Sequence, residues 1–205
     1  MESFTWPGLR PSTEKTKVAV ILPGAKYPVE APLLFWTAQM LVNLGWHVRA
    51  VRWTLDDAAR RDPYAYTATA AEMAFADAPP AATRLIVAKS FGTLCLPWAE
   101  RAGVPGLWLT PILTDPRLRD TLASTSKSDL LLGGTKDELW DGGRRGEKNG
   151  TFVEIPGADH GLQLRGNWRS SVAAQSSALD HIENFVLRLD PHSGPRASAS
   201  SRVDR

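Results

Sequence analysis

The sequence predicts an α/β fold, with a mainly parallel sheet of about six strands and helices on both of its faces. Short apolar runs rich in Val, Ile and Leu alternate along the chain with longer segments in which apolar residues recur at helical spacing. The short runs are continuously apolar, as is typical of parallel strands that are buried on both faces. Together these two patterns predict a single sheet covered by helices.

Six apolar runs are predicted to be strands. They are residues 18–22, 47–53, 85–88, 107–113, 130–132 and 152–155. Four segments are predicted to be helices. They are residues 31–44, 64–76, 91–102 and 170–189. Pro23 and Gly24 follow the first strand, and Gly45 follows the first helix, as residues that end such elements. Pro97 must kink or shorten the third helix.

We expect one domain, residues 17–189, preceded by a polar N-terminal extension, residues 1–16. Residues 190–205 are rich in Ser, Pro and Arg without hydrophobic periodicity, so we expect a disordered tail. The chain shows neither the apolar core of a signal peptide at its start nor a run as long as a membrane span. A single cysteine, Cys95, excludes an intrachain disulfide. These features predict a cytoplasmic protein without a membrane partner.

Charge and motif content argue against several classes of function. The formal net charge is +2, and Lys and Arg are spread along the chain, so nucleic acid is not an expected partner. The four His and one Cys are dispersed, without the spacing of metal ligands. The chain also lacks the glycine-rich motifs that bind dinucleotides or nucleoside triphosphates. The oligomeric state stays open.

Ser90 stands where an apolar strand is predicted to turn into a helix. Small residues, Ala88 and Gly92, lie two positions to either side of it. A strand that turns sharply into a helix exposes the residue at the turn, and the neighbouring residues must be small because the two arms nearly touch. This is the pattern of a nucleophile elbow, with Ala88 in place of the usual first glycine. The alternative is a serine that only caps the helix.

Asp137 and His160 complete a catalytic constellation with Ser90. Each of the three follows the end of a predicted strand, in the chain order Ser, Asp, His. Ligands bind beyond these strand ends in α/β sheets. A serine hydroxyl needs a base to take its proton, and the base needs a carboxylate to orient it. Ser90, His160 and Asp137 are the candidates for these roles.

Structural, non-catalytic interpretations of the same residues stay open. Asp137 is also a candidate turn residue, with Glu138 and Asp141 as rival acids. His160 is also a candidate loop histidine. Asp159 is adjacent to His160, and because an adjacent side chain generally points away, we expect a structural role for it.

Acyl transfer also needs two N–H donors for the developing oxyanion. The N–H of Phe91, directly after the nucleophile, is one candidate. The loop after the first strand supplies the other, for which Ala25 is preferred over Lys26, and Gly24 permits the tight turn. The alternative for this loop is a plain strand-to-helix turn.

The segment between the fourth and fifth strands, residues 114–127, is too short for a cap domain, so we expect an open site. Substrate contacts would then come from loops. The candidates are Lys26, Tyr27, Trp36, Leu113, Trp140 and Trp168. Tryptophan at any one of these positions is more often part of a core than of a pocket.

The chain resembles small members of the α/β-hydrolase superfamily, near the dienelactone-hydrolase-like proteins and short bacterial hydrolases. The matching pieces are residues 22–25, 89–93, 134–137 and 156–162, and the resemblance covers about residues 17–189. It implies a Ser-Asp-His triad, an oxyanion hole built from main-chain N–H groups, and no metal or organic cofactor. Two departures are Ala88 and the lack of the first two strands of larger members.

These observations predict a serine hydrolase that cleaves a carboxylic ester, thioester or lactone of a small acyl substrate through an acyl-enzyme on Ser90. One alternative keeps the fold and the triad but uses them for acyl transfer, cyclisation or elimination. Another is a protein of the same fold that only binds a ligand or partner, since fold alone does not decide function. The sequence leaves the identity of the substrate open.

Overall fold

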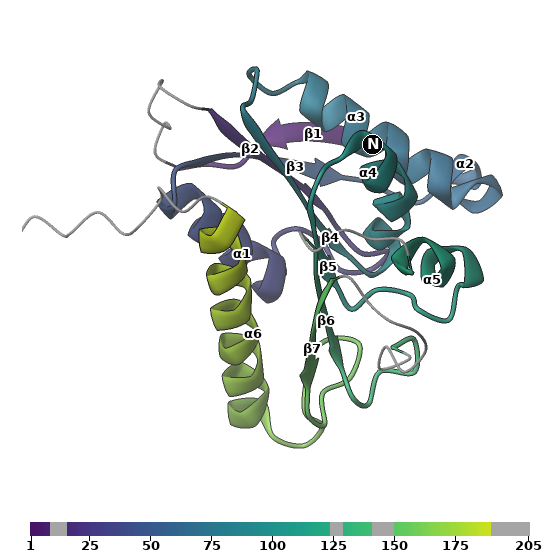
Figure 1. The fold of residues 1–205 in the computed structure, drawn as a ribbon. Helices are drawn as coiled ribbons and strands as arrows, with labels where there is room; N and C mark the ends of the chain where they lie inside the picture. Colours follow the sequence, from purple (N-terminus) through teal and green to yellow (C-terminus); the bar gives the residue numbers. More distant parts are fainter. Residues whose placement is uncertain (9–15, 124–128, 141–149, 190–205) are drawn as a thin grey trace, which may run out of the picture.

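The chain folds around one seven-stranded sheet with the strand order β1-β3-β2-β4-β5-β6-β7 (Figure 1). The computed structural model describes residues 1–8, 16–123, 129–140 and 150–189. The strands are β1 (Glu2–Thr5), β2 (Lys17–Leu22), β3 (Trp46–Arg52), β4 (Thr83–Lys89), β5 (Gly106–Leu109), β6 (Leu130–Gly134) and β7 (Thr151–Ile155). Every neighbouring pair is parallel except β1 with β3. The predicted α/β fold with a mainly parallel sheet is confirmed.

The strand that sequence analysis did not anticipate is β1, which lies within the expected N-terminal extension. It pairs antiparallel with β3, with Phe4 opposite Ala50. Arg49 on β3 donates hydrogen bonds to the hydroxyl groups of Ser3 and Thr5, the latter at 2.8 Å. Trp6 follows and is buried in the core. Polar side chains thus hold this edge strand, so its sequence lacks the apolar run that marks the other strands.

Helices cover both faces of the sheet (Figure 1). They are α1 (Pro32–Asn43), α2 (Asp57–Arg61), α3 (Pro63–Ala76), α4 (Leu96–Ala102), α5 (Pro116–Leu122) and α6 (Trp168–Leu189). Apolar residues of α1 and α6 pack in one hydrophobic cluster with one face of the sheet. Those of α3, α4 and α5 pack in a second cluster with the opposite face. Burial on both faces explains why the central strands are continuously apolar.

The helix predicted after Ser90 is divided into two. A 3₁₀ segment, η1 (Ser90–Cys95), comes first, and α4 follows it. Pro97 lies in the first turn of α4, where its missing N–H group removes no helical hydrogen bond. The proline therefore shortens the helix without kinking it. Gly103 ends α4 in the left-handed conformation, with φ of 62°.

Within the described ranges, no helix is both long enough and apolar enough to cross a membrane. The same residues include no group of three or more His, Cys, Asp or Glu side chains that could hold a metal ion. The expected tail, residues 190–205, and the rival acid Asp141 lie outside the described residues.

Candidate active site

Ser90 lies at the end of β4 in a strained main-chain conformation, with φ of 52°. A non-glycine residue at positive φ is uncommon and often marks a functional turn. A Cβ atom on Gly92 would lie 2.7 Å from the carbonyl oxygen of Leu22 and 2.8 Å from that of Pro23. Only glycine therefore fits there, and Ala88 is fully buried on the other arm. The local structure is the sharp strand-to-helix turn that the small residues predict.

His160 lies between Ser90 and Asp137 and is hydrogen-bonded to both. Its Nε2 atom is 2.8 Å from the Ser90 Oγ atom, and its Nδ1 atom is 2.7 Å from Asp137 Oδ2. An ionised carboxylate only accepts hydrogen bonds, which places the ring proton on Nδ1 and leaves Nε2 free to accept from the serine hydroxyl. The Asp137 side chain is 1% exposed and the His160 side chain 35%. The acid is therefore enclosed, while the imidazole is open to solvent.

Hydrogen bonds from main-chain N–H groups tie the loop that carries Asp137 to the loop that carries His160. Lys136 N donates to the carbonyl oxygen of Ala158 at 2.9 Å, and Gly157 N donates to Thr135 Oγ1 at 2.8 Å. A Cβ atom on Gly134 would lie 2.1 Å from the Ala158 oxygen, so the two loops approach each other as closely as a glycine allows. This contact fixes Asp137 and His160 relative to each other.

The structure also distinguishes Asp137 from Asp159 and Glu138, the neighbouring acids within the described residues. Asp159 Oδ1 accepts hydrogen bonds from the N–H groups of Gly161 and Gln163, at 2.8 and 3.1 Å, and so shapes its own loop. Glu138 is exposed. Asp137 Oδ1 accepts from Leu139 N at 2.9 Å, which holds the carboxylate toward His160.

The loop expected to supply an oxyanion donor lies beside Ser90. A Cβ atom on Gly24 would lie 3.5 Å from the Ser90 Cβ atom, and Gly24 N donates to the Tyr27 carbonyl oxygen, which closes a tight turn. Ala25 and Lys26 are exposed at the tip of this turn. The predicted donors, Ala25 and Phe91, thus lie on the two segments that flank the serine.

Aromatic side chains fix these two segments. The Phe91 ring packs edge-on against Trp53, with 5.7 Å between ring centroids, and against Tyr66 at 6.3 Å. Trp53 Nε1 donates to the Gly24 carbonyl oxygen at 3.3 Å. The same indole thus contacts both sides of the candidate oxyanion site.

Two of the expected substrate contacts are core residues instead. The Trp140 indole packs directly on Gly133, is 7% exposed, and donates from Nε1 to Glu154 Oε1 at 2.8 Å. It fills the space beside β6 and β7, so it does not face a substrate. Leu113 is also buried. Tyr27 is half-buried, with its ring turned to a lysine, and Lys26 is exposed.

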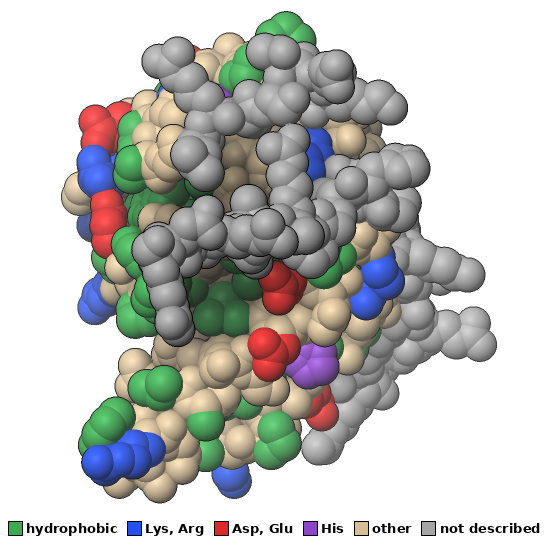
Figure 2. Space-filling view, turned by 90° about the vertical axis from the view of Figure 1, so that its left-hand side faces the viewer, with side chains coloured by type: hydrophobic (Ala, Val, Ile, Leu, Met, Phe, Trp, Pro, Cys, Tyr) green, Lys and Arg blue, Asp and Glu red, His purple; other side chains and the backbone are tan. Residues whose placement is uncertain are grey.

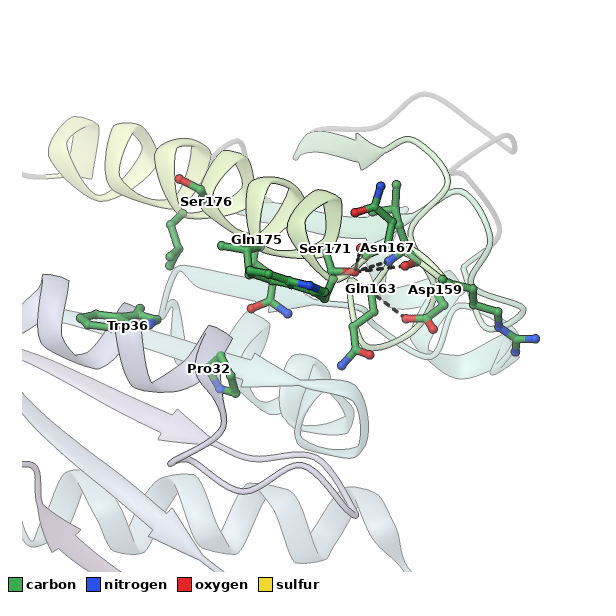
Figure 3. A pocket seen from close by; sticks show the side chains of 14 residues that line it. Pro32, Trp36, Asp159, Gln163, Asn167, Ser171, Gln175 and Ser176 are labelled. Carbon is green, nitrogen blue, oxygen red and sulfur yellow. Dashed lines mark hydrogen bonds between the residues drawn. The ribbon is translucent and has the colours of Figure 1, made fainter.

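Trp36 and Trp168, the other expected contacts, are exposed by 56% and 66%. Both line a groove of about 830 Å³ between α1 and α6, and Figure 3 shows Asp159 at one end of it. Figure 2 views the molecule from the side where α6 lies in Figure 1, and hydrophobic side chains are visible there in a hollow. Neither Ser90 nor His160 lines this groove. Trp36 and Trp168 therefore lie apart from the cluster of Ser90, His160 and Asp137.

Lys89 is a residue of the site that sequence analysis missed. Its side chain is almost fully buried, with 1% of the residue exposed. The Nζ atom donates to Thr110 Oγ1 at 2.7 Å and to the main-chain oxygen of His160 at 2.9 Å. Burial lowers the pKa of Lys89 to about 8, against the opposing effect of the Asp137 and Asp159 charges. The available signal was a lysine that ends an otherwise apolar strand directly before the serine.

No protein-family model and no curated protein sequence matches the chain. Solved structures with similar folds include Est1E from Butyrivibrio proteoclasticus with bound ferulic acid, at 14% identity, a TM-score of 0.61, and coverage of 88% of this chain and 95% of that one. XC6422 from Xanthomonas campestris, an α/β serine hydrolase without a lid, matches at 17% identity and a TM-score of 0.58, covering 91% and 94%.

A third similar structure is the Pyrococcus furiosus esterase Pf2001, at 14% identity and a TM-score of 0.61, with coverage of 85% of this chain and 84% of that one. At such low identity the likeness establishes the fold, and the site has to be argued from its own geometry. The sheet order, the turn at Ser90 and these neighbours agree, and the chain has the α/β-hydrolase fold.

Proposed function

We propose that the protein is a serine hydrolase that cleaves a carboxylic ester, thioester or lactone of a small acyl substrate through an acyl-enzyme on Ser90. One observation carries this proposal. A serine on a strained turn is hydrogen-bonded to an imidazole, which is in turn hydrogen-bonded to an enclosed carboxylate. A serine hydroxyl is activated for nucleophilic attack by this arrangement. Similar folds in the esterase Pf2001 and in XC6422, the serine hydrolase without a lid, support the proposal.

In the first half-reaction, Ser90 Oγ bonds to the acyl carbonyl carbon while its proton passes to His160 Nε2. Asp137 stabilises the imidazolium that forms. The carbonyl oxygen becomes an oxyanion, which the N–H groups of Phe91 and Ala25 would stabilise. The tetrahedral intermediate then breaks the bond to the leaving oxygen or sulfur, and His160 returns the proton to the departing alcohol or thiol.

In the second half-reaction, water attacks the acyl carbon of the acyl-enzyme, and His160 accepts a proton from it. The second tetrahedral intermediate then breaks the bond to Ser90 Oγ, and His160 returns its proton to that oxygen, which releases the carboxylic acid and restores the serine hydroxyl. Water can reach the base because the His160 side chain is about one-third exposed. Exposure of this kind favours hydrolysis of the acyl-enzyme, and we propose hydrolysis over transfer to another acceptor.

The test is covalent labelling with a fluorophosphonate probe, followed by mass spectrometry of the labelled peptide. We expect wild-type protein to be labelled at Ser90, and Ser90→Ala to abolish the label. His160→Ala should slow labelling by at least about 100-fold because general-base catalysis typically contributes that much. Ser177→Ala, an exposed serine on α6, is the matched control and should label like wild type.

Two results would contradict the proposal. One is a folded wild-type protein that reacts with no fluorophosphonate. The other is equal labelling rates in wild type and His160→Ala, since the serine would then not depend on the imidazole. A folded, unreactive protein would instead favour a ligand-binding role for the site around Ser90.

A further inference from the structure

Lys89 occupies a position where a charged group is normally unfavourable. It ends β4, its side chain is almost entirely withdrawn from water, and its strand neighbours Val87 and Ala88 are fully buried. An isolated ammonium in such a place is strongly disfavoured, so lysines are rarely buried unless they are paired. The partners of Lys89 therefore indicate what the charge is for.

These partners come from different parts of the fold. The Nζ atom donates to Thr110 Oγ1, at the end of β5, and to the carbonyl oxygen of His160. It also lies 4.6 Å from the centre of the Tyr27 ring, on the loop after β2. A cation over an aromatic face is stabilised by the ring. One ammonium group thus joins the base loop to the loop that carries a candidate oxyanion donor.

Two of the partners are held in place by further contacts. Thr110 has φ of 43°, which is a genuine outlier for a β-branched residue, and its N–H donates to Leu132 O at 2.6 Å. The Tyr27 hydroxyl accepts a hydrogen bond from Leu33 N at 3.0 Å, in the first turn of α1. Burial raises the pKa of the Tyr27 hydroxyl, which keeps it neutral. These contacts therefore hold Thr110 and Tyr27 in place around the ammonium group.

We propose that Lys89 is a positioning residue that acts through His160: its ammonium holds the main chain of His160, and thereby keeps the imidazole between Ser90 and Asp137. The catalytic consequence rests on the proposed hydrolase function, whereas the placement of the imidazole does not. Tyr27 takes a supporting role in this arrangement, beneath the ammonium, in place of the substrate contact expected from the sequence.

The charge of Lys89 matters as well as its length. The charged groups that act on it are Asp137 and Asp159, and the other facing groups are Thr110, Tyr27 and the His160 carbonyl. Hydrogen bonds from a charged donor are roughly twice as strong as those from a neutral one. Since the pKa of Lys89 is about 8, the hold on His160 should weaken as the pH rises through this value. Wild-type labelling of Ser90 should then decline at alkaline pH.

The central variant is Lys89→Met, which removes the charge and keeps most of the chain length. Lys17→Met is the matched control, because Lys17 also donates to a carbonyl oxygen, that of Leu44 at 2.8 Å, and lies over an aromatic ring, that of Trp46. Lys17 begins β2, whereas the site lies at the opposite ends of the parallel strands. Thr110→Val removes one partner of the ammonium with little change in volume, and it carries the test if Lys89→Met fails to fold.

Two measurements are made on each folded variant. The first is the strongly deshielded proton NMR signal of the His160 Nδ1–H group, assigned by its loss in His160→Gln. The second is the rate of fluorophosphonate labelling of Ser90 between pH 6 and about 10. We expect Lys89→Met to lose or broaden the NMR signal, to label at least about 10-fold more slowly near pH 7, and to lack the alkaline decline. Thr110→Val should shift both measurements in the same direction, and Lys17→Met should match wild type in both.

The outcomes separate the two proposals. An unchanged NMR signal in both Lys89→Met and Thr110→Val would overturn the positioning role, and so would wild-type labelling rates across the pH range. If the signal is present in wild type and lost in Lys89→Met, while no probe labels Ser90 in either, the positioning role stands and the hydrolase proposal fails.

Discussion

Asp129, directly before β6, is a buried carboxyl group whose effect on the free energy of unfolding can be tested quantitatively. The residue is 2% exposed, and its Oδ1 atom accepts hydrogen bonds from Gly106 N at 2.7 Å and from Trp108 Nε1 at 2.9 Å. Burial raises the pKa of this carboxyl group from 3.8 to about 7, although the two hydrogen bonds oppose the shift, and the Glu100 charge adds to it. Folding therefore disfavours ionised Asp129.

The size of this effect follows from the difference in pKa. About three pKa units at roughly 1.4 kcal/mol each amount to about 4 kcal/mol of lost stability once the group is ionised in the folded state. The sign is opposite to that of a salt-bridged carboxylate. Between about pH 4 and pH 7 the folded protein keeps a proton that the unfolded chain has released, so the free energy of unfolding falls as the pH rises through this window.

The perturbation is Asp129→Asn, which cannot ionise but keeps the acceptor oxygen for Gly106 and Trp108. Urea unfolding of both proteins at pH 5 and pH 8 gives the unfolding free energy of the variant minus that of wild type at each pH. The contributions of all other titrating groups cancel in this difference because the two proteins share them. We expect the variant to gain about 2.5 kcal/mol relative to wild type between the two pH values, because the loss in wild type runs from pH 5 to the folded pKa of about 7 at roughly 1.4 kcal/mol per pH unit. Asp57→Asn, an exposed surface change, should show no such gain. The reasoning would be refuted if the unfolding free energies of Asp129→Asn and wild type differed by the same amount at pH 5 and at pH 8.

Four further predictions use the same preparations. Gly92→Ala should lose about 1–3 kcal/mol of stability and slow Ser90 labelling, because its Cβ would press on the main chain of Leu22 and Pro23. Gly103→Ala has open space but positive φ, so urea unfolding should show a loss of about 1 kcal/mol with unchanged labelling, and slowed labelling would contradict this. Asp137→Asn should keep the fold by circular dichroism and slow labelling at least 100-fold, since the acid orients the base; a wild-type rate would contradict this. Cys95 is fully buried, which raises the pKa of its thiol, so it should react with iodoacetamide only in denaturant, and fast labelling of native protein would contradict this.

The parts of the fold that could be predicted are those with a local sequence signature. The continuous apolar runs located the central parallel strands, since burial on both faces leaves no polar positions. The small residues around Ser90 indicated the sharp turn. A side chain at position 92 would collide with the main chain at the end of β2, so this position requires glycine. The positions of Asp137 and His160 followed from the rule that parallel strands end at one edge of the sheet.

The parts that could not be predicted depend on long-range contacts. Strand β1 is held by the side chain of Arg49, which lies more than 40 residues away in the sequence. The helices α2 and α5 have five and seven residues, too few to show a helical period, although Asp56 and Asp115 cap their N-termini. Trp140 was expected to contact substrate, and only the glycine beneath it, Gly133, shows that its place is in the core.

Lys89 is one of three neighbours of Ser90 that hold the strained turn in place. The strain at Ser90 persists only if the surrounding residues hold the turn in place. Lys89, before the serine, reaches the base loop, and Phe91, after it, packs against Trp53 and Tyr66. Gly92 packs on the end of β2. The three neighbours thus anchor the turn at Ser90 to three different parts of the fold: the loop that carries His160, the aromatic pair Trp53 and Tyr66, and the end of β2. A change in any of them should therefore alter the geometry around the serine before it unfolds the sheet, which is why labelling and stability have to be measured together.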